Sequence, residues 1–138
     1  MYLLDTNVIS ELRKPHADKH VKAWAGRVPA QSLFLSAITI LELETGVLRV
    51  ERRDARQGTA LRKWLNDQVL VAFVDRILPI DTAVALRCAQ LHVPDLMAHS
   101  DALIAATALV QGLIVVTRNT QDFEAADVGL IDPWQPQR

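Results

Sequence analysis

Residues 100–117 read SDALIAATALVQGLIVVT, and this stretch contains both kinds of element from which the chain is built. Ser100 to Gln111 is rich in Ala and Leu and predicts a helix, which Gly112 is well suited to end. Leu113 to Thr117 follows as an uninterrupted apolar run, typical of a central strand in a parallel sheet covered by helices on both faces. The stretch therefore predicts an α/β fold.

The rest of the chain repeats this alternation of strand and helix. Short apolar runs predict strands at residues 2–4, 33–35 and 77–80. Apolar residues at helical spacing predict two helices between the first two strands, a long amphipathic helix after Ser36, another after Gly58, and one capped by Asp81 or Thr82. We therefore expect a single domain over residues 1–138, a three-layer α/β/α sandwich around a mainly parallel sheet.

The composition excludes several classes of protein. Half of the 138 residues are hydrophobic, which is enough to bury one core, and no low-complexity tract indicates disorder. The single cysteine excludes an internal disulfide and favours a reducing compartment. Neither a signal peptide nor a membrane-spanning run is evident. We therefore expect a soluble, cytoplasmic protein without a membrane partner.

The formal net charge of −1 conceals an uneven distribution. Residues 11–63 hold eleven Lys or Arg against six Asp or Glu, whereas residues 64–138 hold four against nine. A chain divided in this way can present a basic surface beside an acidic pocket. The basic residues from Arg49 onward are either a solvated helix surface or a nucleic-acid contact. The candidates for RNA contact are Arg49, Arg52, Arg53 and Arg56.

Polar side chains lie after the predicted strands and at the start of the helix that precedes the strongest one. They are Asp5, Thr6, Asn7, Glu42, Asp101, Thr117, Asn119 and Asp122. In open parallel sheets, ligands bind at the carboxyl ends of the strands, so acids from distant segments can meet there. Close carboxylates disfavour each other's ionised forms, and Mg²⁺ or Mn²⁺, which prefer oxygen ligands, relieves that conflict. The acids thus predict a divalent-cation site suited to phosphodiester hydrolysis.

Each carboxylate also has a purely structural interpretation. Asp5 can cap the helix that follows it, and Asp101 can interact with the positive end of a helix dipole. Glu42 follows Thr39 at the S/T-x-x-E spacing of a capping box, which by itself favours the structural role. Asp122, taken alone, is typical of a solvated loop. No single carboxylate therefore decides between a structural and a catalytic role.

Four motifs together resemble those of the PIN-domain ribonucleases, specifically the toxins of VapBC-type toxin–antitoxin pairs and the similar FitB proteins. They are YLLDTNVISEL at residues 2–12, SAITILEL with Gly46-Val47 at 36–47, DALIAATA at 101–108, and TRN with Asp122-Phe123 at 117–123. Each motif alone is weak, but four in this order, over almost the whole chain, are specific.

The resemblance implies roles for individual residues. The implied catalytic acids are Asp5, Glu42, Asp101 and Asp122, and the implied polar supports are Thr6, Asn7, Thr117 and Asn119. Asp5 and Asp101 are the implied direct Mg²⁺ ligands. Many PIN domains carry Asp where this chain has Asn119, whereas the FitB-like branch offers its acid at Asp122. We therefore expect one Mg²⁺ and leave a second open.

The resemblance further implies a Mg²⁺-dependent endoribonuclease toxin in which a metal-activated water hydrolyses RNA. It also implies a homodimer and a small antitoxin partner that supplies DNA binding. Two alternatives stay open. One is a PIN-like interaction module that no longer cuts, which Asn119 permits. The other is a small phosphohydrolase with Asp5 as nucleophile, which is disfavoured because Asp5-Thr6-Asn7 lacks the second Asp of a D-x-D arrangement.

Overall fold

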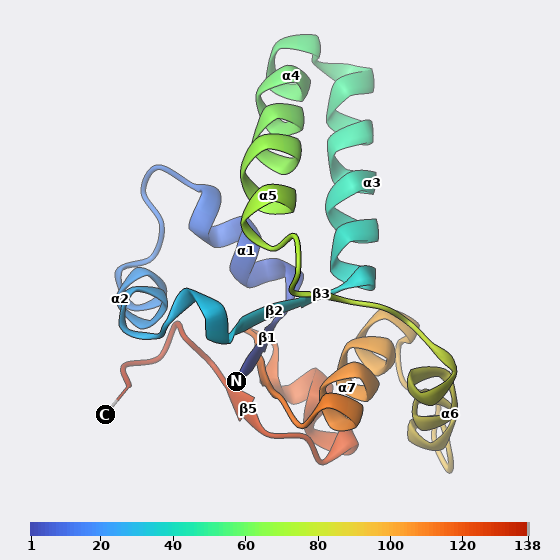
Figure 1. Cartoon of the computed structure of the whole chain (residues 1–138). Helices are drawn as coiled ribbons and strands as arrows, with labels where there is room; N and C mark the ends of the chain where they lie inside the picture. The colour runs from blue at the N-terminus through green and yellow to red at the C-terminus, as the bar shows by residue number, and fades with distance from the viewer. Residues whose placement is uncertain (138) are drawn as a thin grey trace.

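A five-stranded, entirely parallel sheet lies between two groups of helices in the computed structural model, which describes residues 1–137 (Figure 1). The strands are β1 Tyr2–Leu4, β2 Leu33–Ser36, β3 Ile77–Leu78, β4 Ile114–Val116 and β5 Leu130–Ile131. The α-helices are α1 Thr6–Arg13, α2 Lys19–Arg27, α3 Ala37–Arg53, α4 Ala55–Lys63, α5 Leu70–Ala72, α6 Thr82–Leu91 and α7 His99–Gln111. Short 3₁₀ segments are η1 Ala30–Ser32 and η3 Thr120–Ala126, and a π-helical segment, η2, spans Trp64–Val69.

The strand order is β3-β2-β1-β4-β5, so β1 is the central strand and β4 is its neighbour. Parallel neighbours require crossover connections, and here helices make most of those crossovers. The predicted α/β sandwich is thus confirmed, with β4 in the interior of the sheet. Strand β5 was not predicted, because two residues between Gly129 and Asp132 give too short an apolar run to recognise.

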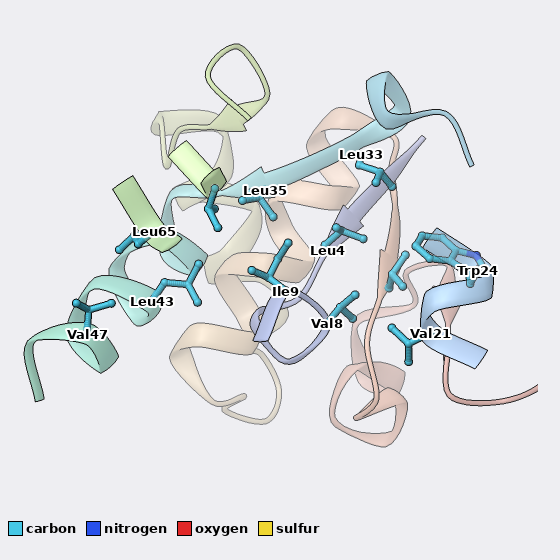
Figure 2. Packing of buried hydrophobic residues seen from close by; sticks show 12 residues of the cluster. Leu4, Val8, Ile9, Val21, Trp24, Leu33, Leu35, Leu43, Val47 and Leu65 are labelled. Atoms are coloured by element: carbon cyan, nitrogen blue, oxygen red, sulfur yellow. The ribbon is translucent and has the colours of Figure 1, made fainter. Parts of the chain in front are cut away.

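The two faces of the sheet bury alternate residues of each strand, as the period of two requires. Leu4, Leu35 and Val116 pack with α1, α2, α3 and η2 in one apolar cluster (Figure 2). Leu3 and Val115 face the other way and pack with α7 and η3. Because both faces are covered, the strands read as continuous apolar runs, and their polar successors are left at the carboxyl edge of the sheet.

Helix α4 corrects one prediction, because it begins at Ala55 and not after Gly58. Asp54 caps it, accepting a hydrogen bond from the backbone N–H of Gln57 at 3.1 Å. Gly58 lies inside α4 and is buried against Glu51 of α3, where an added Cβ would stand 2.5 Å from the Glu51 Cα. Glycine is therefore required here by the close approach of two helices.

Helices α3 and α4 form a hairpin that projects from the sheet (Figure 1). Arg62 of α4 joins it to α3, with donor–acceptor distances of 2.6 Å to Glu44 and 3.0 Å to Glu51. The hydrogen bonds from Arg62 to Glu44 lower the pKa of the Glu44 carboxyl. Arg62, predicted as part of a basic surface, is thus held by two acids.

Within residues 1–137, no helix combines the length and hydrophobicity needed to cross a membrane.

Candidate active site

Asp5 stands at the carboxyl end of β1 and begins α1 as its N-cap. Its Oδ1 accepts a hydrogen bond from the Thr6 backbone N–H at 2.8 Å, and its Oδ2 accepts one from Thr117 Oγ1 at 2.8 Å. Burial raises the pKa of the Asp5 carboxyl despite these bonds, and the charges of Glu42 and Asp122 add to the rise. Asp5 therefore caps its helix and also belongs to a cluster of interacting acids.

Thr117 follows β4 and is fully buried, and its hydroxyl links the end of β4 to the end of β1 at this edge of the sheet. Besides donating to Asp5, its Oγ1 accepts from Asn7 Nδ2 at 3.3 Å and from the Asn119 backbone N–H at 3.0 Å. The backbone N–H of Arg118 donates to Asn7 Oδ1 at 3.4 Å. Three of the predicted supports thus meet around one carboxylate and restrict where it points.

Replacing Thr117 with Val is expected to destabilise the protein by about 1–3 kcal/mol, because it leaves the partners of one buried hydroxyl unpaired. Val has nearly the same shape as Thr, so packing changes little. Thr117→Ser retains the hydroxyl and should lose much less. Urea unfolding followed by circular dichroism measures both values. Equal losses in the two variants would show that the Thr117 methyl group, and not its hydrogen bonds, carries the stability.

Glu42 faces Asp5 from α3, and its structural interpretation as a capping-box residue is wrong. Helix α3 begins at Ala37, and Ser36 caps it by accepting from the Ile38 backbone N–H at 3.1 Å. Glu42 lies a turn and a half further on, where its Oε1 accepts a hydrogen bond of 2.6 Å from Thr6 Oγ1. Thr6 therefore positions Glu42 toward the end of β1.

Asp101 lies in the first turn of α7 and is half-buried, and the N-cap residue of that helix, Ala98, has no side chain that can cap it. Burial raises the pKa of the Asp101 carboxyl to about 6, and the charges of Asp5, Asp122 and Glu42 contribute to that rise. Within residues 1–137, no hydrogen bond or ion pair involves its side chain. Four carboxylates from four distant segments are therefore close enough to repel one another.

Asp122 and Asn119 complete this edge from the segment after β4. Asp122 lies in the first turn of η3 and is exposed, and its backbone N–H donates to the Asn119 carbonyl oxygen at 3.0 Å. Asn119 is also exposed and directs its backbone N–H to Thr117. The structure thus brings Asp122 to the acidic cluster, whereas Asn119 acts through its backbone.

The donor set of this acidic cluster suits a hard divalent cation. The ion pairs within residues 1–137 lie elsewhere, so no basic side chain neutralises the four acids. In the same part of the chain, no three His, Cys, Asp or Glu side chains are gathered tightly enough to hold an ion by themselves. Mg²⁺ usually takes only one or two carboxylates and retains several waters. The four acids offer oxygen donors whose negative charge no basic side chain within residues 1–137 neutralises, and such a donor set fits a Mg²⁺ ion.

The predicted RNA-contact arginines are exposed but not equally close to the acids. Arg49 and Glu42 line one hollow on α3. Arg52, Arg53 and Arg56 lie where α3 passes into α4, at the end of the hairpin away from the sheet (Figure 1). Of the four, only Arg49 shares a hollow with one of the acids, Glu42, and the other three lie further along the hairpin.

Sequence reasoning missed two residues beside the acidic cluster. Thr39, read only as a cap, is fully buried, with its Oγ1 3.4 Å from Thr6 Oγ1. The second is Arg118 of the TRN motif, and its place between Thr117 and Asn119 is the sequence signal that indicates it.

Comparisons with known proteins agree with this fold. The family model of the PIN domain matches residues 2–129. The chain is 39% identical to "VapC ribonuclease Y4jK" of Sinorhizobium fredii, over 99% of each chain. It is 40% identical to "Toxin FitB" of Neisseria gonorrhoeae, over 97% of this chain and 99% of that one.

A solved structure described as FitAB bound to an IR36 DNA fragment matches with a TM-score of 0.92 at 36% identity, covering 100% of this chain and 99% of that one. Full-length identity and fold agree with the resemblance that the four motifs indicate. The chain therefore belongs to the PIN-domain family and, within it, to the VapC- and FitB-like ribonuclease toxins of toxin–antitoxin systems.

Proposed function

We propose that this chain is a Mg²⁺-dependent endoribonuclease in which Asp5 and Asp101 are the direct metal ligands and Glu42 and Asp122 complete the acidic cluster. The observation that carries the proposal is the Asp101 carboxyl, whose pKa is raised by burial and by three other acids. A site with this excess of negative charge calls for a cation. Mn²⁺, with the same preference for oxygen ligands, is expected to substitute.

The chain's own residues orient the acids and supply the negative charge of the site. Thr117 and Thr6 hold Asp5 in place through both of its oxygens, and Thr6 also holds Glu42. Asp101 and Asp122, whose side chains make no such bonds within residues 1–137, stay available as ligands. Asp5 and Asp101 would hold the Mg²⁺, which would make a bound water more acidic and would stabilise negative charge on the phosphodiester. The RNA 2′-hydroxyl therefore need not take part.

The direct test incubates the purified, antitoxin-free chain with RNA of mixed sequence, with Mg²⁺ or with EDTA. We expect cleavage only with Mg²⁺, and products that carry a 5′-phosphate and a 3′-hydroxyl. A folded protein that binds RNA without Mg²⁺-dependent turnover would instead support an interaction module. Products ending in a 2′,3′-cyclic phosphate would contradict attack by water.

The effect of Mg²⁺ on thermal stability should depend on pH. Because the folded-state pKa of Asp101 is raised from 3.8 to about 6, its protonated form is favoured in the folded protein. Its contribution to stability is therefore present below about pH 4 and is lost as the pH rises through about 6. Mg²⁺ reverses that loss only where the carboxyl is ionised. Scanning calorimetry should show a larger Mg²⁺-induced rise in Tm at pH 7.5 than at pH 5, and equal rises would contradict Asp101 as a ligand.

We also propose a cognate antitoxin and a homodimer. Similar proteins have been solved as a toxin–antitoxin complex from Klebsiella pneumoniae and as FitAB bound to a DNA fragment, which supports a protein partner for this chain. In the proposal this partner is small and carries the DNA-binding function. An antitoxin that placed a basic side chain among the four acids would compete with the metal. Size-exclusion chromatography with light scattering tests the dimer, and a strictly monomeric chain at micromolar concentration would count against it.

A further inference from the structure

Arg118 lies beside the acidic cluster, and within residues 1–137 no carboxylate pairs with its guanidinium. It directly follows Thr117, and its backbone N–H is bonded to Asn7, two residues after Asp5. Its side chain is exposed and forms no ion pair or hydrogen bond within residues 1–137. Arg118 and Asp122 line the same small hollow. An unneutralised cation therefore stands at the edge of four acids.

Trp134 holds that cation in place. The Arg118 Cζ lies 5.2 Å from the centroid of the Trp134 ring, within the range of a cation–π contact. The ring itself is fixed, because it packs against the main apolar cluster and its backbone N–H donates to Asp132 Oδ1 at 2.9 Å. A stacked guanidinium is restrained in position, yet its planar set of N–H donors stays free for an acceptor that offers two neighbouring oxygens.

The charge balance indicates what that acceptor is. A phosphodiester brings a further negative charge to a site of four carboxylates, which one divalent cation only half neutralises. Arg62 does not neutralise the remaining negative charge, because its guanidinium is already paired with Glu44 and Glu51. Arginine binds phosphate through two parallel, charge-assisted hydrogen bonds, which set orientation as well as affinity.

We propose that Arg118, positioned by Trp134, binds a backbone phosphate of the RNA next to the bond that is cleaved. This inference rests on the proposed ribonuclease function and assigns a substrate-binding residue outside the acidic cluster. Trp134 is a positioning residue, since it acts through Arg118.

Steady-state cleavage of a fluorophore–quencher RNA of mixed sequence tests the proposal. Arg118→Ala should raise KM about tenfold, the loss expected for a hydrogen-bonded charge, with a much smaller change in kcat. Arg118→Lys should restore part of the affinity. The slope of log affinity against log salt concentration should become shallower by about 1, which corresponds to the loss of one phosphate contact. The matched control is Arg87→Ala, which removes an arginine bonded to Gln90 on α6 and should leave KM and the salt dependence unchanged.

Two further measurements separate positioning from general structural damage. Trp134→Leu should raise KM as Arg118→Ala does, Trp134→Phe should retain most of the affinity, and Trp134→Leu should add nothing in the Arg118→Ala background. Anisotropy of a fluorescein-labelled RNA is also measured on Asp101→Asn protein with and without Arg118→Ala. This binding assay decides the role of Arg118 even if the wild-type chain cuts no RNA, an outcome that would overturn the ribonuclease proposal alone.

The proposal is overturned if Arg118→Ala matches Arg87→Ala in KM, salt dependence and RNA anisotropy. It is equally overturned if Arg118→Ala leaves RNA binding intact but weakens inhibition by the cognate antitoxin, because Arg118 would then serve the protein partner.

Discussion

Asp101→Asn should reduce Mg²⁺-dependent RNA cleavage to background without unfolding the protein. The loss should exceed the factor of about 100 that the removal of an outer-shell partner of a metal ligand costs, because a proposed direct ligand is lost. The amide keeps the shape of the side chain. It also removes one of four mutually repelling charges, so the Tm of the metal-free protein at neutral pH should not fall.

Initial rates on RNA, with circular dichroism of the same preparation, measure both expectations. Asp67→Asn is the matched control, since it removes one exposed carboxylate on η2 and should leave cleavage unchanged. Cleavage by Asp101→Asn at the wild-type rate would exclude Asp101 from the site. A cooperative loss of structure would assign it a structural role instead.

Gly58→Val should strongly destabilise the α3–α4 hairpin. A Cβ at this position meets Glu51 Cα at 2.5 Å and Glu51 N at 2.9 Å, both of which are backbone atoms that cannot rotate away. The helices would have to separate, and over-packing of this kind costs up to about 3 kcal/mol. Arg62 would lose its geometry against Glu44 and Glu51 at the same time. Chemical denaturation with a constant m-value measures the loss.

Gly46→Ala provides the control in the same hairpin. Gly46 also lies inside a helix, but nothing stands within 4 Å of an added Cβ. Alanine should therefore stabilise the protein by up to about 1 kcal/mol through helix propensity alone. Destabilisation of similar size in both variants would show that α3 and α4 tolerate no side chain at either glycine, and would contradict the specific contact with Glu51.

The sequence predicts the strands well where an uninterrupted apolar run ends at a polar residue, as at Asp5, Ser36 and Thr117. The prediction fails where the role of a residue depends on its contact with a distant segment of the chain. Gly58 looked like a boundary before a helix, but it is a contact point whose cause is Glu51. Strand β5 was missed because its two residues gain their pairing only from β4.

The same distinction applies to the acidic cluster. The positions of Asp5 and Asp101 followed from strand and helix ends, and their roles stay a prediction. Spacing alone misread Glu42 as a capping residue, because the partner that orients it, Thr6, lies 36 positions earlier in the chain. The stacking of Arg118 on Trp134 joins residues on either side of β5, a strand the sequence did not reveal.

The central place of β1 has a consequence for how the protein is made. Its neighbour β4 and the hydroxyl that orients Asp5 belong to residues 114–117, and Asp122 follows later still. A ribosome releases β1 well before these segments, so a nascent chain that ends before residue 114 has neither the restraint on Asp5 nor the fourth acid. The proposed acidic cluster therefore cannot assemble on a nascent chain until residues 114–122 have left the ribosome.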